Sequence, residues 1–380
     1  MSIDWKVQLF KLNYDDQEAS AVSDVLNDRW LTMGMRTSEF ESNFEKFLQN
    51  DSRCLAVSSC TAALHLALLA LDIGPGDEVI IPALTFIADC NTVKMVGARP
   101  VLADSTSLDN WNICSKTIKK CITNRTKAVI VVHYAGFPCD MPSIVKLCRD
   151  NNLKIIEDVA HAPGASHKER FCGTWGDIGC FSFFSNKNLS VGEGGMLVTP
   201  SPDLFERLQK LRSHGMSSLT LDRHKGRAIS YDVSLPGLNY RIDEMRAALG
   251  IVQLKKLQEA NFSRMHLTNR YRQNFRGSSI SMPFKHPLKD STSSYHILPI
   301  LLPNAQKRED IIKSLKSEGI QSSIHYPPFW QFSAFQGEFY ESDAPVVAEI
   351  SKRQLTLPLY PTMSFDEVDF VSYALLNCLM

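Results

Sequence analysis

The 380-residue sequence has no excess charge of either sign, because 41 lysines and arginines balance 41 aspartates and glutamates. A protein that binds nucleic acid through a broad basic surface needs a clear positive excess, so the balance argues against that class of function. It argues equally against an acidic disordered tail. A small polar ligand is still compatible with it, because a few local groups suffice to bind one.

Long apolar runs and paired cysteines are also missing. No run reaches the roughly 18 apolar residues of a membrane span, and the N-terminal MSIDWKVQLFKLNYDD lacks the apolar core of a secretory signal. The ten cysteines form no C-x-x-C pair and no zinc-type spacing. We therefore expect a cytoplasmic protein without membrane contact, in which most cysteines are buried and all are reduced.

Several common catalytic and nucleotide-binding motifs are absent as well. The sequence has no G-x-x-x-x-G-K-[ST], H-E-x-x-H, G-x-S-x-G or EF-hand loop, and VGEGGML places Leu197 where a dinucleotide motif needs its last glycine. The ten histidines are too dispersed for a local metal site. These absences argue against the corresponding nucleotide and metal sites.

Between residues 53 and 199, short β-branched runs alternate with helical stretches. Most runs are almost continuously apolar, as expected for strands covered on both faces. This alternation predicts an α/β fold with a mostly parallel central sheet flanked by helices. The expected strands are CLAVSS (54–59), DEVIIPA (77–83), ARPVLAD (98–104), KAVIVVHY (127–134), KIIEDVA (154–160), GCFSFF (179–184) and GGMLVT (194–199).

After residue 201 the strand signal weakens. A long amphipathic helix is expected over 243–270, and the mixture of strand and helix patterns that follows indicates a smaller α+β domain. We therefore expect a large domain over residues 1–255 and a small C-terminal domain over residues 256–380.

Three features fall where α/β sheets bind ligands, at the carboxyl ends of strands. The first is VSSCTAALHL, in which residues 58–61, including Cys60, lie at the start of a helix expected to begin near Thr61. The unpaired N–H groups and the dipole of a helix start favour a phosphate. An ordinary cap formed by a Ser or Thr side chain is the alternative interpretation.

The second feature is KIIEDVAHA, which places Glu157 and Asp158 at the end of an apolar strand. Adjacent strand residues point to opposite faces, so one carboxylate is expected to face the crevice and the other to face away. A carboxylate in the crevice needs a cationic partner or several hydrogen-bond donors. Loop capping is the alternative for a lone aspartate.

The third feature is Lys187, in a short polar loop between two apolar runs. Desolvation would lower its pKa from about 10.4 and yield the neutral amine that attacks a carbonyl, although a solvated loop lysine is the plainer interpretation. A phosphate site, a carboxylate and a semi-buried lysine match what pyridoxal 5′-phosphate (PLP) requires. Phe86 could provide the face on which the cofactor ring stacks, or could be a core residue.

Together these segments resemble the DegT/StrS family of PLP-dependent sugar aminotransferases. The resemblance runs almost from end to end and implies the fold of aspartate aminotransferase, fold type I. It rests on WLTMGMRTSEFESNFEKFL, SSCTAALHLALLALDIGPGDEVIIPALTFIA, EDVAHAPGA, GDIGCFSFFSNKNLSVGEGGMLVT, GLNYRIDEMRAALG and LPLYPTMSFDEVDFV.

The resemblance implies roles for individual residues. Lys187 would bind the cofactor aldehyde covalently and later move a proton between the substrate carbon and C4′ of the cofactor. Asp158 would pair with the ring nitrogen, and Phe86 would stack on the ring. Phosphate contacts are implied for Cys60, Thr61, Ser182 and, across the interface of a homodimer with shared active sites, Asn239.

The sequence departs from the family pattern at several positions. Cys60 stands where glycine is frequent, and His161 stands where many members have a glutamine beside the phenolic oxygen of the cofactor; a histidine can still donate a hydrogen bond there. Ser185 and Asn186 replace a frequent Pro and Thr. Relatives that act as sugar dehydratases have histidine in place of Lys187, so the lysine favours transamination.

The expected reaction moves the amino group of L-glutamate to a keto-sugar linked to a nucleoside diphosphate, a 3- or 4-keto-deoxysugar. The product would be an amino sugar for a surface polysaccharide or a secondary metabolite. A sugar dehydratase, a ketocyclitol aminotransferase and a non-catalytic regulator are the alternatives. Five residues are candidates for lining the substrate pocket, with a capping or surface role as the alternative for each: Arg212, His214, Arg241, His325 and Tyr326.

Overall fold

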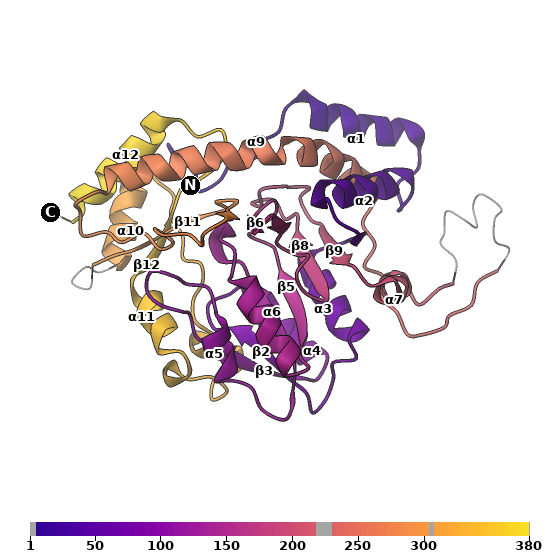
Figure 1. The fold of residues 1–380 in the computed structure, drawn as a ribbon. Helices are drawn as coiled ribbons and strands as arrows, with labels where there is room; N and C mark the ends of the chain where they lie inside the picture. The colour runs from indigo at the N-terminus through magenta and orange to yellow at the C-terminus, as the bar shows by residue number, and fades with distance from the viewer. Residues whose placement is uncertain (1–4, 218–229, 304–307, 380) are drawn as a thin grey trace.

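A seven-stranded sheet forms the centre of the protein in the computed structural model, which describes residues 5–217, 230–303 and 308–379 (Figure 1). The strand order is β1-β9-β8-β5-β4-β2-β3, and β9 alone runs antiparallel to its neighbours β1 and β8. The strands match the seven expected runs, which confirms the mostly parallel α/β sheet. Their bounds are β1 (Arg53–Val57), β2 (Glu78–Pro82), β3 (Arg99–Ala103), β4 (Thr126–Val132), β5 (Lys154–Asp158), β8 (Ile178–Ser182) and β9 (Gly195–Thr199).

Helices cover both faces of this sheet because its strands are apolar on both sides. In β2, Val79 and Ile81 pack in one core cluster with helices α3 (Cys60–Ala70) and α4 (Ile87–Met95). Ile80, between them, packs in another cluster with α5 (Ser115–Lys119) and α6 (Met141–Asp150). The alternation of side chains along a strand therefore explains why near-continuous apolar runs were found.

The longest helix, α9 (Glu244–Asn274), crosses the top of the molecule in Figure 1 and begins at the N-cap Asp243, whose side chain accepts from the N–H of Arg246 at 2.9 Å. Its first half packs on α1 (Asp16–Asp28) and α2 (Met35–Leu48), and α12 (Phe365–Asn377) also packs on it. The boundary expected after residue 255 thus falls inside a continuous helix. In the part of the chain that the structure describes, the other α-helices are α7 (Pro202–Arg212), α10 (Arg308–Ser317) and α11 (Pro345–Arg353).

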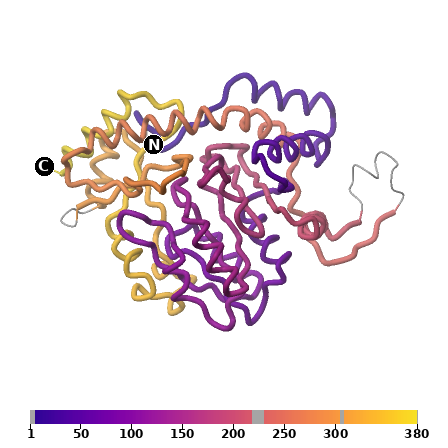
Figure 2. The backbone as a smooth tube through the Cα atoms, viewed as in Figure 1, coloured from indigo at the N-terminus to yellow at the C-terminus, as the bar shows by residue number. Residues whose placement is uncertain are grey.

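The C-terminal part has a core of its own. Strands β11 (Leu298–Leu301) and β12 (Gln354–Leu357) pair antiparallel and pack with α10, α12 and the second half of α9. Figure 2 shows the N-terminal segment lying beside this part, where the Val7 N–H donates to the Gly319 carbonyl at 3.1 Å. The segment from Phe329 to Ile350 instead packs against the core of the large sheet. The residues just before Phe329 therefore lie at the edge of that sheet.

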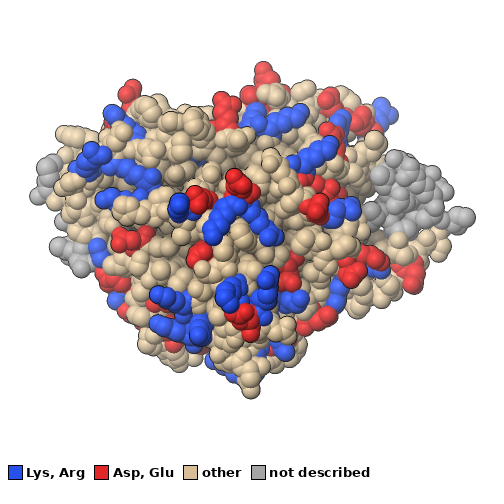
Figure 3. Space-filling view, viewed as in Figure 1, with Lys and Arg blue, Asp and Glu red and all other residues tan. Residues whose placement is uncertain are grey.

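Three short strands form a small antiparallel sheet: β10 (Ser291–Thr292), β6 (Ser166–His167) and β7 (Arg170–Phe171). All ten cysteines are free thiols, and six of them are buried. Within the described ranges, no helix is long and apolar enough to cross a membrane, and no cluster of side chains suits a metal ion. On the face seen in Figure 3, acidic and basic side chains are interspersed.

Candidate active site

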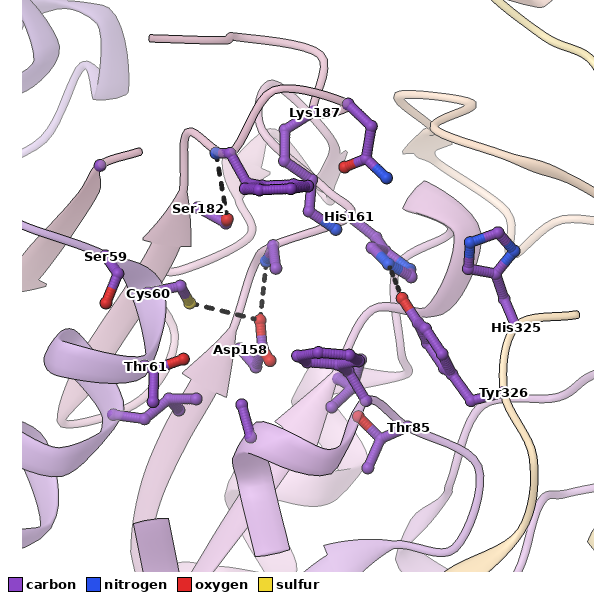
Figure 4. Close-up of a pocket in the computed structure, with 18 of the residues that line it drawn as sticks. Ser59, Cys60, Thr61, Thr85, Asp158, His161, Ser182, Lys187, His325 and Tyr326 are labelled. Carbon is purple, nitrogen blue, oxygen red and sulfur yellow. Dashed lines mark hydrogen bonds between the residues drawn. The ribbon is translucent and has the colours of Figure 1, made fainter. Parts of the chain in front are cut away.

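A cavity of about 390 Å³ opens at the carboxyl ends of β1, β2, β5 and β8 (Figure 4). Parallel strands deliver their ends to one edge of a sheet, so residues far apart in the sequence meet there. The volume lies within the range typical of small-molecule sites, about 300–1,000 Å³. Nine residues expected from the sequence line it: Cys60, Thr61, Phe86, Asp158, His161, Ser182, Lys187, His325 and Tyr326.

The start of α3 forms one wall of the cavity. Ser59 caps the helix by accepting from the Ala62 N–H at 3.1 Å, which leaves the first N–H groups, those of Cys60 and Thr61, without an intrahelical partner. Gly195 on β9 approaches closely here, because a Cβ at that position would lie 2.6–2.8 Å from the backbone of Ser59 and Cys60. This turn is therefore compatible with both interpretations. The Ser59 side chain caps the helix, and the N–H groups of Cys60 and Thr61 remain for an anion.

Asp158 lies at the end of β5 and points into the cavity (Figure 4). Its Oδ1 accepts from the Ala160 N–H at 2.7 Å and lies 3.9 Å from the Cys60 thiol sulfur. Burial raises the pKa of Asp158, while the Ala160 N–H and the charge of Lys187 act in the opposite direction. The side chain is therefore a buried carboxyl group that a cationic partner would stabilise in its charged form.

The neighbouring Glu157 points to the other side of the sheet, as the alternation of strand side chains predicts. It is fully buried and its two carboxylate oxygens accept from the N–H groups of Gly173, Trp175 and Gly176 at 2.6–2.8 Å. His133 Nε2 lies 3.0 Å from the same carboxylate. Glu157 thus organises the loop before β8, and only Asp158 faces the cavity.

Lys187 comes from the loop between β8 and β9, and its side chain extends into the cavity. Burial lowers the pKa of Lys187 to about 8, although the nearby Asp158 opposes this shift. The loop turns back sharply because β9 runs antiparallel to β8, and this reversal directs the lysine toward the carboxyl ends of the strands. At about pH 7 about a tenth of the amine is therefore uncharged, far more than for a solvated lysine.

Aromatic side chains and histidines form the remaining wall. The Phe86 ring is 52% exposed, so it is a cavity residue and not a core residue, and it lies 5.5 Å from the Tyr326 ring between centroids. His161 Nε2 lies 2.8 Å from the Tyr326 hydroxyl oxygen. The Tyr134 hydroxyl donates to the backbone carbonyl of His325, which ties the segment with His325 and Tyr326 to the large sheet.

The other four candidate residues, among them Asn239, which is expected to reach the partner's cavity, do not line this cavity within one chain. Arg212 is buried elsewhere, where it forms an ion pair with Glu41 at 2.7 Å and donates to the Ala56 carbonyl at 2.8 Å. His214 and Asn239 are exposed, and Asn239 pairs with Ser213 in an isolated β-bridge. Arg241 lies beside them in sequence and pairs with Val57 in a second such bridge.

Sequence reasoning missed one residue that contacts the lysine. His296 Nε2 lies 3.5 Å from Lys187 Nζ, although 109 positions separate the two residues. The motif SYHILPILL was interpreted only as a strand, and a buried histidine near the start of a strand carries no local signal of its partner. Thr85 and Glu193 also line the cavity without having been singled out.

The donor set of the cavity fits pyridoxal 5′-phosphate. A helix start with unpaired N–H groups suits a phosphate, a buried carboxyl group suits a protonated ring nitrogen, and a lysine with a lowered pKa suits an aldehyde. The half-exposed Phe86 ring offers a stacking surface. All four groups face one cavity of sufficient size, so the residues match each part of the cofactor.

Comparisons with known proteins agree with this chemistry. The chain is 38% identical over 363 residues to the spore coat polysaccharide biosynthesis protein SpsC of Bacillus subtilis, covering 93% of this chain and 92% of that protein. The structure of Helicobacter pylori PseC, an aminotransferase involved in the biosynthesis of pseudoaminic acid, superposes with a TM-score of 0.89 at 28% identity and covers 99% of both chains.

A further similar structure is a cofactor-bound form. It is the PLP form of the sugar aminotransferase assigned as Spr1654 from Streptococcus pneumoniae, which superposes with a TM-score of 0.89 at 29% identity over 96% of each chain. The sequence model of the DegT/DnrJ/EryC1/StrS aminotransferase family matches residues 13–376, nearly the whole chain. The protein therefore belongs to the DegT/DnrJ/EryC1/StrS aminotransferase family and is a PLP-dependent aminotransferase of the α/β, fold type I class.

Proposed function

We propose that this protein transfers the amino group of L-glutamate to a keto-sugar bound to a nucleoside diphosphate, in the biosynthesis of an amino sugar. The observation that carries the proposal is the position of Lys187 and Asp158 in one cavity with the α3 helix start, in a chain of the sugar aminotransferase type. The similarity to SpsC and PseC, whose names refer to polysaccharide and pseudoaminic acid biosynthesis, supports a sugar as the acceptor and a surface polysaccharide as the destination.

In this proposal the cofactor, when bound, supplies an electron sink that stabilises negative charge on the substrate carbon. Lys187 Nζ accepts the proton from that carbon and returns it at a neighbouring position, which its lowered pKa allows near neutral pH. Asp158 holds the positive charge of the ring nitrogen. Cys60, Thr61 and Ser182 hold the phosphate group.

The sugar would enter beside Phe86 and Tyr326, on the open side of the cavity. His325 is nearly buried and its Nδ1 lies 2.9 Å from the Thr356 hydroxyl oxygen, so its Nε2 is left for a ligand. Burial lowers the pKa of His325 to about 4, so a neutral imidazole would face the sugar. A neutral imidazole can donate or accept a hydrogen bond with a sugar hydroxyl group.

We further propose a homodimer in which Asn239 contacts the phosphate in the partner's cavity, with Arg241 and His214 near the same interface. In a single chain Asn239 is exposed and does not line the described cavity, and Tyr231 and Val233 nearby are more than half exposed. A partner subunit would cover these apolar side chains. Ten free cysteines support a reducing, cytoplasmic location.

The assembly is tested by light scattering together with Asn239→Ala. We expect a dimer and a weaker affinity for PLP in the variant, with an unchanged mass. A fully active monomer at the assay concentration would exclude the cross-subunit role.

The reaction itself is tested by a spectrum and a product assay. Addition of L-glutamate to the PLP form should remove its visible absorbance and release 2-oxoglutarate, and the product form should then aminate a member of a panel of keto-sugar nucleotides. Lys187→Ala should abolish both steps. A dehydratase would instead consume no net amino donor. Amination of ketocyclitols alone would show that the acceptor is a ketocyclitol and not a keto-sugar nucleotide.

A further inference from the structure

The nitrogen of His296 that faces Lys187 is a hydrogen-bond acceptor, and the surrounding amide groups determine this. His296 is 3% exposed, and its two ring nitrogens lie near different partners: Nε2 is 3.5 Å from Lys187 Nζ, and Nδ1 is 2.8 Å from Asn188 Oδ1. In a neutral imidazole one nitrogen donates and the other accepts. Which nitrogen carries the proton depends on the orientation of the Asn188 amide.

The Asn188 amide has one consistent orientation. Its Nδ2 donates to the backbone carbonyl of Ser294 and to Asn261 Oδ1, both at 2.7 Å, so both of its hydrogens are used by oxygen acceptors. Asn261 is itself oriented, because its Nδ2 donates to the Pro163 carbonyl at 2.9 Å and only its oxygen is left to face Asn188. Asn188 Oδ1 must therefore accept from His296 Nδ1–H.

It follows that His296 Nε2 carries a lone pair and points it toward the lysine. Burial lowers the pKa of His296 well below its usual value, and the charge of Lys187 adds to this effect, so the imidazole is neutral. The charged and titratable groups that face His296 are Lys187, His161, Arg264 and His325. His161 and His325 are neutral for the same reason, burial, which lowers the pKa of each.

We propose that His296 is a positioning residue for the reaction: its Nε2 accepts a hydrogen bond from Lys187 whenever the lysine is not bound to the cofactor, with Asn188 and Asn261 holding the acceptor tautomer. An acceptor stabilises the ammonium form more than the amine, because hydrogen bonds from charged donors are stronger. The contact therefore keeps Lys187 basic enough to take up a proton inside a cavity that otherwise disfavours its charge. The inference rests on the role proposed above for Lys187.

The test measures the pKa of the Lys187 amine directly. The full-length protein is labelled with trace acetic anhydride from about pH 6 to about pH 10. The labelling is done once without cofactor and once with bound pyridoxamine phosphate. Mass spectrometry then compares the labelling of the Lys187 peptide with that of the exposed Lys154. For His296→Leu, which removes the acceptor, we expect the pKa of Lys187 to fall by about 0.5–1 unit. His296→Gln, which offers an amide oxygen, should recover part of the shift.

A matched control removes a histidine elsewhere. His65 Nδ1 lies 3.1 Å from the Tyr240 hydroxyl oxygen, and His65 does not line the cavity, so His65→Gln should leave the Lys187 titration unchanged. A Lys187 pKa that stays constant or rises in folded His296→Leu would overturn the proposal. Should that variant not fold, Asn188→Leu gives the answer, because loss of the amide oxygen frees the ring to reverse its tautomer and the pKa of Lys187 should again fall.

A second measurement addresses the tautomer alone. The ¹⁵N spectrum of protein with labelled histidine should show His296 protonated at Nδ1 and unprotonated at Nε2, with assignment by loss of the signal in His296→Gln. The opposite tautomer would overturn the inference. Neither measurement needs a sugar substrate, so they can support the role of His296 even if the proposed amination fails. Conversely, an unchanged pKa of Lys187 in an active enzyme would contradict only the role of His296.

Discussion

His161 donates a hydrogen bond to Tyr326, because the other nitrogen of its ring is already an acceptor. His161 Nδ1 accepts from the Ala135 N–H at 3.2 Å, and Nε2 lies 2.8 Å from the Tyr326 hydroxyl oxygen. The proton of the neutral ring therefore sits on Nε2. Since Tyr326 accepts this bond, its own hydroxyl hydrogen is free to point toward a ligand in the cavity.

This arrangement predicts that Tyr326→Phe removes a donor from the site. We expect kcat/KM for the sugar to fall about tenfold, the cost of about one hydrogen bond, and the melting temperature to fall slightly, because the buried His161 Nε2–H loses its acceptor. His161→Gln can still donate to Tyr326 and should be close to wild type, whereas His161→Leu keeps the Tyr326 hydroxyl group but no longer orients it, and should lower kcat/KM less than Tyr326→Phe does. Steady-state kinetics of the three variants measures this, and equal activity of Tyr326→Phe and wild type would show that the hydroxyl group contacts no ligand.

The pKa of Lys187, lowered to about 8 from the model-compound value of 10.5, predicts how cofactor capture depends on pH. The neutral amine is the reactive form, so its fraction should rise about tenfold between about pH 7 and about pH 9, whereas an unshifted lysine would show a rise of nearly a hundredfold. Stopped-flow absorbance of PLP added to cofactor-free protein measures the rate. A hundredfold dependence would mean that the lysine is solvated in the free chain.

We expect the two adjacent carboxylates of β5 to have different roles, one in the stability of the fold and the other in catalysis. Glu157 accepts three backbone N–H groups on the far side of the sheet, so Glu157→Gln, which turns an amide NH₂ toward these donors, should lower the free energy of unfolding by about 2–4 kcal/mol. Asp158→Asn, its matched variant, should change stability by less than about 1 kcal/mol but lower kcat at least about 100-fold. Urea unfolding and kinetics of both proteins distinguish the two roles, and the reverse pattern would contradict the assignment.

Arg212 should behave as a structural residue. It is 2% exposed and its ion pair with Glu41 is buried on the arginine side, so Arg212→Met leaves a carboxylate without its cation and should cost about 3 kcal/mol of stability. The KM for either substrate should not change. Adding Glu41→Gln should recover part of the loss, which a double-mutant cycle measures. A raised KM with normal stability would instead indicate that Arg212 lines the substrate pocket.

Much of the fold could be predicted from local patterns. The seven strands were found because buried strands are uninterrupted apolar runs, and the start of α9 was found because an amphipathic pattern begins at Asp243. The antiparallel direction of β9 was not predicted. Strand direction depends on the path of the connecting loop, and parallel and antiparallel buried strands have the same apolar pattern. The break expected after residue 255 likewise fell within a helix that packs on both parts of the protein.

The sequence by itself determined which chemistry this chain carries: Lys187, Asp158 and the helix start near Thr61 each lie at or just after the end of a strand, and parallel strands deliver their ends to one edge. Only the tertiary structure decided how these groups are tuned. The acceptor for Lys187 is His296, 109 positions away, and the partner of His161 is Tyr326, 165 positions away. Hydrogen bonds depend on distance and orientation in space, and burial sets the pKa of each group, so neither can be inferred from neighbours in the sequence.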